Sequence, residues 1–373
     1  MKSSLRWVFV LGSFGALTAC ESAEEGSAGG SDGGSTASIG ASGGTSTGGP
    51  GTTTGGTTNT GDNVASSMGG GSSGTGDGTG GTSGGGVSGG STGSEGGSGG
   101  PDIDPVPPEP TVGCGGDTNP GSGAFTINVN GTDRYYRIDI PANYDSNTEY
   151  KLVFVFHGLG GTADGTADGF NGFYKYQGLL DQADDDAIFV AGQGLASSSG
   201  GAGWDNDGDI DFITQALEDI RTGYCIDNAR IFVSGGSFGG IMSNRVGCAM
   251  GDDIRAIAPV MGNGPDTTWA TKNDADEWVC SKYGEASCTG DVAAWVTHGR
   301  ADPTVAFCLG EWTLEHWLEQ NGCSDSSTAN GVGECVEYSG CATGYPVVWC
   351  PTDLAHSSPD YAPAEIWKFF SRF

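Results

Sequence analysis

Short apolar runs alternate with amphipathic segments along the C-terminal part of the chain. Residues 151–156 form an apolar run typical of a strand that is buried on both faces. Further runs of this kind lie at residues 187–191, 230–233, 254–261, 293–297 and 345–349. Helical periodicity lies between or after them, at residues 173–184, 211–223, 238–250, 310–321 and 363–373.

This alternation predicts an α/β domain with a doubly wound, mostly parallel sheet. Residues 124–129 and 135–140 flank the turn pair Asn130-Gly131, which predicts an N-terminal antiparallel hairpin at the edge of that sheet. Functional sites in such sheets lie beyond the C-terminal ends of the strands, so the catalytic residues are expected there.

The N-terminal segment follows a different pattern. Lys2 and Arg6 precede an apolar stretch that is too short for a permanent membrane span. The stretch ends in Leu17-Thr18-Ala19-Cys20. These residues resemble a bacterial lipoprotein processing box. We expect residues 1–20 to be a signal peptide and Cys20 to carry a lipid; the alternative is an ordinary secretory peptide cleaved nearby. Glu21, where an inner-membrane lipoprotein would carry an aspartate, favours the outer membrane or cell surface. This one residue does not decide between the inner and the outer membrane.

Residues 21–112 consist mostly of Gly, Ser and Thr, with scattered acidic residues and neither Lys nor Arg. Such a segment cannot bury enough apolar surface to offset the entropy of ordering it. We therefore predict a disordered tether, stiffened by prolines at residues 105–110, that holds a folded domain of residues 113–373 away from its anchor.

Charge and cysteine content narrow the class of protein further. The net charge of −31 argues against nucleic-acid binding, because no basic patch in the sequence offsets the repulsion between its carboxylates and phosphate groups. The cysteines that follow Cys20 are even in number and lie in the predicted folded domain, as expected of an exported, disulfide-braced protein with five bridges. Their connectivity is open, although Cys280 and Cys288 are close enough to bridge a local loop. The last quarter is expected to be braced by Cys323, Cys335, Cys341 and Cys350.

The strongest chemical motif is Gly235-Gly236-Ser237-Phe238-Gly239, which lies between an apolar run and a helical segment. Glycines two residues before and after the serine allow a sharp turn that presents its hydroxyl, as in the nucleophile elbow of serine hydrolases. The same spacing at residues 70–74 and 86–90 lacks a strand and a helix, so we interpret those matches as chance.

A serine nucleophile needs a base and an orienting acid, which follow it in the order acid, then histidine, in α/β-hydrolases. His356, after the last apolar run, is the candidate base, and Asp302, after the run before it, the candidate acid. Asp353 is the rival acid. His298 is interpreted as a structural histidine at a strand end, and His316 as a solvated or packed helix residue.

Two N–H groups are needed to stabilise the oxyanion of an acyl-transfer intermediate. We assign them to Phe238 and to Leu159 in the glycine-rich loop that begins at His157, itself interpreted as orienting that loop. Trp204 and Trp349 are candidates for an aromatic wall at the substrate site.

Metal sites are not indicated by the sequence. The cysteine and histidine spacings fit no zinc motif, and the acidic run 205–211 departs from the EF-hand pattern. We interpret that run as a polar loop with an aspartate capping the helix that starts at Phe212. No cofactor is expected.

With these motifs the chain resembles secreted feruloyl esterases and their poly(3-hydroxybutyrate) depolymerase relatives, α/β-hydrolases that include acetylxylan esterases. The resemblance covers essentially the whole folded domain and rests on the motifs Phe154-Val155-Phe156-His157-Gly158, Gly203-Trp204, Cys225-Ile226-Asp227, Gly235-Gly236-Ser237-Phe238-Gly239-Gly240, His298-Gly299 with Asp302, and His356. It implies a triad of Ser237, His356 and Asp302 that cleaves esters through an acyl-enzyme.

The leading hypothesis is a surface-tethered, monomeric serine esterase acting on feruloyl or acetyl groups of plant cell-wall polysaccharide. A poly(3-hydroxybutyrate) depolymerase, with a polyester substrate, is the enzymatic alternative. A catalytically silent carbohydrate-binding protein on a stalk is the alternative of another class. In each case the expected contact with a membrane is only through the lipid at Cys20.

Overall fold

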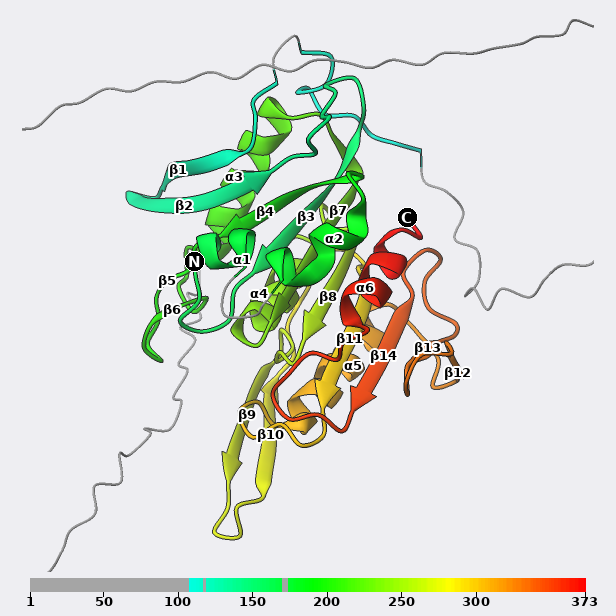
Figure 1. Cartoon of the computed structure of the whole chain (residues 1–373). Coiled ribbons are helices and arrows are strands. Elements are labelled where there is room, and N and C mark those ends of the chain that lie inside the picture. Colours follow the sequence, from blue (N-terminus) through cyan, green and yellow to red (C-terminus); the bar gives the residue numbers. More distant parts are fainter. Residues whose placement is uncertain (1–106, 117–118, 170–173) are drawn as a thin grey trace, which may run out of the picture. The chain divides into compact units, whose positions relative to one another are not determined.

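A computed structural model describes residues 107–116, 119–169 and 174–373. The predicted signal peptide, Cys20 and nearly all of the predicted tether lie outside the described residues. In the described part, a ten-stranded sheet has the order β1-β2-β4-β3-β7-β8-β11-β14-β13-β12 (Figure 1). Two short two-stranded sheets, β5–β6 and β9–β10, accompany it.

The strands are β1 (Gly123–Val129), β2 (Thr132–Asp139), β3 (Tyr150–Phe156), β4 (Ala187–Gly192), β5 (Leu195–Ala196), β6 (Ala202–Gly203), β7 (Ile226–Gly236), β8 (Ala256–Val260), β9 (Thr267–Lys272), β10 (Trp278–Gly284), β11 (Ala293–Gly299), β12 (Ser327–Ala329), β13 (Val336–Tyr338) and β14 (Val347–Thr352). The helices are α1 (Ala163–Asp168), the 3₁₀ turn η1 (Lys175–Gly178), α2 (Leu179–Ala183), α3 (Asp209–Gly223), α4 (Phe238–Ala249), α5 (Phe307–Gln320) and α6 (Ala362–Phe370).

The centre of the large sheet is parallel, from β4 through β3, β7, β8 and β11 to β14. The β1–β2 hairpin joins it antiparallel through β2 and β4. The predicted doubly wound sheet with an N-terminal hairpin is therefore confirmed. A second antiparallel edge, formed by β13 and β12 next to β14, was not predicted because strands of three residues carry too short a pattern.

Side chains of the central strands alternate between two cores, one on each face of the sheet. In β3, Leu152, Phe154 and Phe156 join the core that also contains apolar residues of α3, α4 and α5. Val153 and Val155 point to the opposite core, which contains residues of α1, α2 and α6. Figure 1 shows these two helix sets on opposite faces. Burial on both faces explains the unbroken apolar runs of the sequence.

The structure differs from the predicted elements in three places. The expected helix 173–184 is divided into η1 and α2, with residues 170–173 outside the described part. Helix α1 was missed because it is short; it starts where Thr162 accepts a hydrogen bond from the N–H of Gly165. The β9–β10 hairpin was missed because most of its residues are not buried and its apolar periodicity is weak.

Ten cysteines of the described chain form five disulfides, the number predicted, with a connectivity that the sequence left open: Cys114–Cys225, Cys248–Cys288, Cys280–Cys308, Cys323–Cys341 and Cys335–Cys350. The last two brace the final quarter, as predicted. The predicted local pairing of Cys280 with Cys288 is wrong, because Cys280 on β10 faces α5 and Cys288 faces the end of α4. Within the described residues, no helix is long and apolar enough to cross a membrane.

Candidate active site

Ser237 lies at the sharp turn between β7 and α4, as the motif predicted. Its φ of 57° and ψ of −120° are unusual for a residue with a side chain. The flanking glycines are required by close packing: a Cβ on Gly235 would collide with the carbonyl of Gly239, and one on Gly239 with the carbonyl oxygen of Phe156 at the end of β3. The turn therefore holds the serine hydroxyl at the C-terminal edge of the sheet.

Three side chains from separate loops form a hydrogen-bonded chain at this edge. His356, in the loop after β14, lies with Nε2 2.8 Å from Ser237 Oγ. Its Nδ1 lies 2.7 Å from Asp302 Oδ2, in the loop after β11. With a proton on Nδ1, the imidazole donates to the carboxylate and leaves Nε2 free to accept from the serine hydroxyl.

The Asp302 carboxylate is fully buried and fixed from both sides. Its Oδ1 accepts the backbone N–H groups of Thr304 at 2.8 Å and Val305 at 2.9 Å. Burial raises the pKa of Asp302, but hydrogen bonds from His298, His356 and these two N–H groups outweigh it and hold the pKa well below its usual range. The carboxylate therefore stays ionised next to the histidine ring.

Asp353 and His298, the other polar residues considered in the sequence analysis, do not belong to the hydrogen-bonded series Ser237–His356–Asp302. Asp353, the rival acid, is 88% exposed and pairs with Arg300. His298 is buried, with Nε2 2.9 Å from the Val305 carbonyl and 3.4 Å from Asp302 Oδ2. It supports the loop of the acid, which is the structural role predicted for it.

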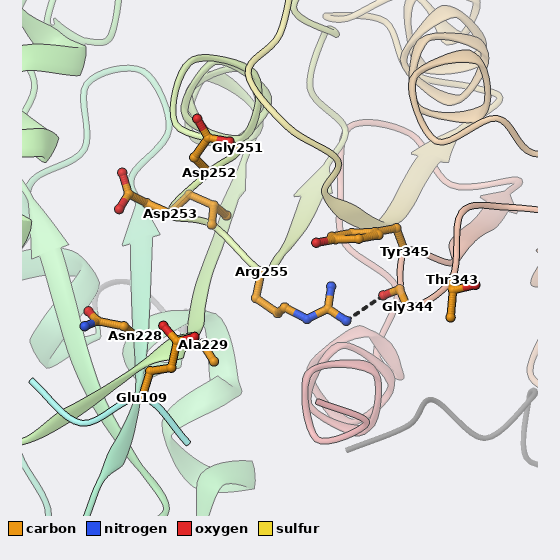
Figure 2. A pocket seen from close by; sticks show the side chains of 11 residues that line it. Glu109, Asn228, Ala229, Gly251, Asp252, Asp253, Arg255, Thr343, Gly344 and Tyr345 are labelled. Atoms are coloured by element: carbon orange, nitrogen blue, oxygen red, sulfur yellow. Dashed lines mark hydrogen bonds between the residues drawn. The ribbon is translucent and has the colours of Figure 1, made fainter. Parts of the chain in front are cut away.

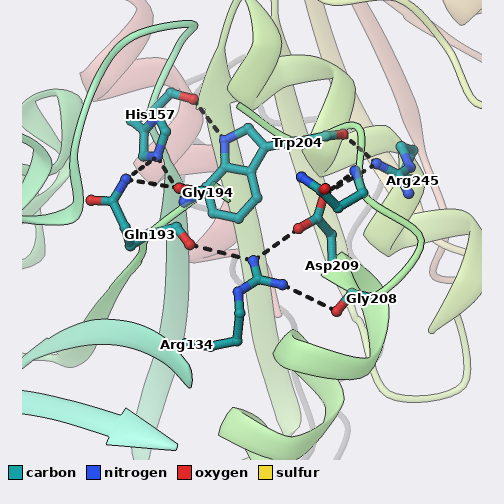
Figure 3. A network of polar contacts seen from close by, with 9 residues as sticks. Arg134, His157, Gln193, Gly194, Trp204, Gly208, Asp209 and Arg245 are labelled. Atoms are coloured by element: carbon teal, nitrogen blue, oxygen red, sulfur yellow. Dashed lines mark hydrogen bonds and ion pairs between the residues drawn. The ribbon is translucent and has the colours of Figure 1, made fainter. Parts of the chain in front are cut away.

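The loop after β3 is fixed by His157. Its Nδ1 lies 2.8 Å from the carbonyl of Gly158, and its Nε2 accepts the N–H of Gly194 at 3.0 Å (Figure 3). Burial lowers the pKa of His157, so the ring is neutral with its proton on Nδ1. The loop orients Leu159, a residue that is 44% exposed and whose backbone N–H has no acceptor among the described residues.

The two predicted substrate tryptophans are buried in the core, so that prediction is wrong for both. Trp204 is 0% exposed, and its indole N–H donates to the His157 carbonyl at 2.9 Å. Trp349 is 8% exposed and packs against Phe307, with ring centroids 5.9 Å apart. Trp204 thus supports the loop of the site from behind, as Figure 3 shows.

A buried ionic network behind Trp204 was missed by the sequence analysis. Arg134 on β2 donates to Asp209 at 2.8 Å, and both side chains are almost fully buried. Arg245 on α4 lies 3.8 Å from the same carboxylate and donates to the Trp204 carbonyl (Figure 3). The predicted helix start at Phe212 with an aspartate cap is wrong, because α3 starts at Asp209 after Gly208, which provides no side-chain cap. The Asp209 carboxylate points inward to the two arginines. The only sequence signal was an arginine at an inward position of a strand.

A metal centre is not supported by the one suitable side-chain cluster found among the described residues. Cys248, Cys288 and His316 come close together, but the two sulfurs are joined in a disulfide. Of the two environments considered for His316, solvated or packed, the structure shows the packed one, with Nδ1 2.9 Å from Asp266 Oδ1.

A cavity of about 390 Å³ lies elsewhere, next to the starts of β7 and β8 (Figure 2). Arg255 borders it and donates to the Gly344 carbonyl at 2.7 Å, while its guanidinium lies 4.6 Å from the ring of Tyr345. The starts of parallel strands are at the opposite edge from Ser237, so this cavity is not part of the site described above.

The sheet order, the two helix layers and the elbow define the α/β-hydrolase fold. Comparison with known proteins gives the closer assignment. The chain is 30% identical over 286 residues to feruloyl esterase D of Neurospora crassa, covering 71% of this chain and 91% of the relative. It is 29% identical over 272 residues to feruloyl esterase C of Emericella nidulans, covering 68% of this chain and 92% of the relative. No family model matches.

Solved esterase structures are also similar, and two of them serve as examples. The acetyl xylan esterase from Aspergillus awamori matches with a TM-score of 0.49 and 16% identity, covering 67% of this chain and 100% of that one. A ferulic acid esterase from Anaeromyces mucronatus, in complex with ferulic acid, matches with a TM-score of 0.45 and 18% identity, covering 69% and 91%. On the sequence relatives, the chain belongs to the feruloyl esterase family and is a carboxylic ester hydrolase.

Proposed function

We propose that Ser237, His356 and Asp302 are the catalytic triad of this esterase. The observation that carries the proposal is the hydrogen-bonded chain from Ser237 Oγ through both ring nitrogens of His356 to Asp302. Ser237 attacks the ester carbonyl while His356 Nε2 takes its proton. Ionised Asp302 stabilises the imidazolium that forms and keeps the ring in its orientation.

The negative charge that develops on the carbonyl oxygen is stabilised by the backbone N–H groups of Leu159 and Phe238. Phe238 is the first residue of α4, so the positive end of the helix dipole faces the same position. His356 then returns its proton to the leaving alcohol, which departs and leaves an acyl group on Ser237. A water molecule, activated by the same histidine, releases the acid and restores the serine.

The substrate we propose is a feruloyl ester on plant cell-wall polysaccharide. The names of the sequence relatives support this choice, since feruloyl esterases are matched over about nine-tenths of their length. The buried, hydrogen-bonded Asp302 argues against a silent binding protein, because such a protein has no need of a triad geometry.

The test compares hydrolysis of methyl ferulate, acetylated xylan and poly(3-hydroxybutyrate) by the full chain, produced under oxidising conditions, with that by Ser237→Ala. We expect turnover of methyl ferulate that falls to background in the variant, while the melting temperature stays within a few degrees. Turnover retained by Ser237→Ala would overturn the nucleophile. Preference for the polyester would overturn the substrate class.

We further propose that residues 113–373 form the esterase domain, residues 21–112 its tether, and a lipid on Cys20 its anchor at the outer membrane or cell surface. The five disulfides support export to an oxidising compartment. In a bacterial host, wild type should partition into the detergent phase and Cys20→Ser into the aqueous phase. Equal partitioning of both would contradict the anchor.

A further inference from the structure

The β9–β10 hairpin leaves the fold at the edge that carries Ser237. It follows β8, whose last residue, Val260, accepts the backbone N–H of Ser237 at 2.9 Å. In Figure 1 the hairpin continues beyond the ends of β8 and β11, past the large sheet. A chain bound along the hairpin would therefore lie next to the candidate active site.

The inner face of the hairpin holds it against the site. Trp278 donates its indole N–H to the backbone carbonyl of Asp302 at 3.3 Å. Cys280, two residues further along the same face, is bonded to Cys308 at the start of α5. Lys282 forms an ion pair with buried Asp266 at 3.0 Å. The Trp278 contact joins the hairpin to the loop of the triad acid. The other two join it to the start of α5 and to the segment between β8 and β9.

The outer face has a different composition. Because side chains alternate along a strand, Trp269 and Thr271 of β9 lie opposite Ser281 and Val279 of β10 on the face away from the disulfide. Val279 is 47% exposed and Trp269 is partly exposed. Tyr283, at the bulge that follows, is 72% exposed. This face therefore presents two aromatic rings, one apolar side chain and two hydroxyls that are at least partly open to solvent.

We infer that this outer face binds the polysaccharide part of the substrate, an inference that rests on the proposed function. Aromatic rings pack against the apolar C–H faces of sugar rings, and the hydroxyls of Thr271 and Ser281 can bond to sugar hydroxyls. The seven residues of β10 extend for about 23 Å, which suits a polymer chain and exceeds a single acyl group.

Charge favours a neutral polymer over an anionic membrane surface. The tip of the hairpin carries Asp274, Asp276 and Glu277, all exposed, and Lys272 is paired with Asp276 at 2.8 Å. This excess of carboxylates repels anionic lipid headgroups, whereas uncharged sugars are indifferent to it.

The test uses the full chain and its Trp269→Ala/Tyr283→Ala variant, assayed on methyl ferulate and on soluble feruloylated arabinoxylan. Loss of the rings should lower the ratio of kcat/KM for arabinoxylan to kcat/KM for methyl ferulate about tenfold, through a higher KM for the polymer. Asp274→Ala at the tip is the control and should keep the wild-type ratio. Trp269→Phe, which keeps an aromatic ring, should retain most of the wild-type ratio, whereas Trp269→Ala should lower it.

Three results would overturn the inference: an unchanged ratio, an equal loss on both substrates, or a change of sedimentation coefficient in the variant that marks the face as a contact between copies. Binding to insoluble arabinoxylan gives a readout that does not depend on turnover. If wild type cleaves no feruloyl ester but binds the polymer through these rings, the proposed function fails and the binding face stands.

Discussion

Ser237 carries a backbone conformation that its neighbours must enforce. A non-glycine residue in such a region costs on the order of 1–3 kcal/mol. Its N–H is bonded to Val260 on β8, and its carbonyl accepts the N–H of Ile241 in the first turn of α4 at 3.0 Å. The strain therefore persists because a strand and a helix fix the residue from both sides.

Gly239→Ala should disturb this turn. The new Cβ would meet the carbonyl oxygen of Phe156, a backbone atom that cannot move without shifting β3. We expect a loss of about 1–3 kcal/mol of unfolding free energy and a lower kcat on methyl ferulate. Gly223→Ala is the matched control, since nothing lies within 4 Å of its Cβ position. Chemical denaturation and steady-state kinetics of both variants measure the difference; equal stability would contradict the packing argument.

Asp302→Asn should separate the two candidate acids. The amide cannot stabilise the imidazolium of His356, and it can bond to the ring in the wrong tautomer, so kcat should fall by about 10³–10⁴. Asp353→Asn should stay near wild type, because Asp353 is exposed and pairs with Arg300 and not with His356 Nδ1, which bonds to Asp302. Turnover of methyl ferulate by both variants decides between them. A larger loss in Asp353→Asn would reverse the assignment.

At the scale of elements, the loop after β3 depends on packing from behind. Trp204 connects it to α4, because its indole N–H bonds to the His157 carbonyl and its own carbonyl accepts from Arg245. The loop that presents Leu159 is thus supported by a helix and by the ion pair of Arg134 and Asp209. A rigid loop is what an oxyanion site requires, since its donors must already be in place when charge develops.

Trp204→Phe should therefore reduce turnover as well as stability. The change leaves the buried His157 carbonyl without its donor, which costs about 1–3 kcal/mol. Trp349→Phe also removes part of a buried indole, but Trp349 packs against Phe307 at the start of α5, whereas the hydrogen bond to His157 comes from Trp204. We expect both variants to melt earlier and only Trp204→Phe to lose kcat on methyl ferulate. A similar kcat for the two would show that the loop does not need this bond.

At the scale of the whole described domain, the disulfides differ in the length of chain they close. Cys114–Cys225 spans a separation of 111 residues, whereas Cys335–Cys350 spans 15. In the chain-entropy description, the long link stabilises by about 5 kcal/mol and the short one by about 3 kcal/mol. The long link joins the start of the domain to the beginning of β7, so it also fixes the N-terminal edge.

Replacing both cysteines of a pair by serine tests this difference. The Cys114→Ser/Cys225→Ser variant should show the lower melting temperature, and Cys335→Ser/Cys350→Ser a smaller decrease. Calorimetry of the two variants under the same oxidising conditions gives the comparison. The reverse order would show that native packing around each bridge, and not loop length, sets its contribution.

The sequence by itself determined the central strands, most helices and the order of Ser237, Asp302 and His356. These features are local: an apolar run buries a strand, and glycines around a serine make a turn wherever they stand. The tertiary structure decided the roles of Trp204 and Trp349, the pairing of Cys280 with Cys308, and the ion pair of Arg134 with Asp209. Each of these depends on which distant segments meet, and a pattern that reports only burial or periodicity carries no record of the partner.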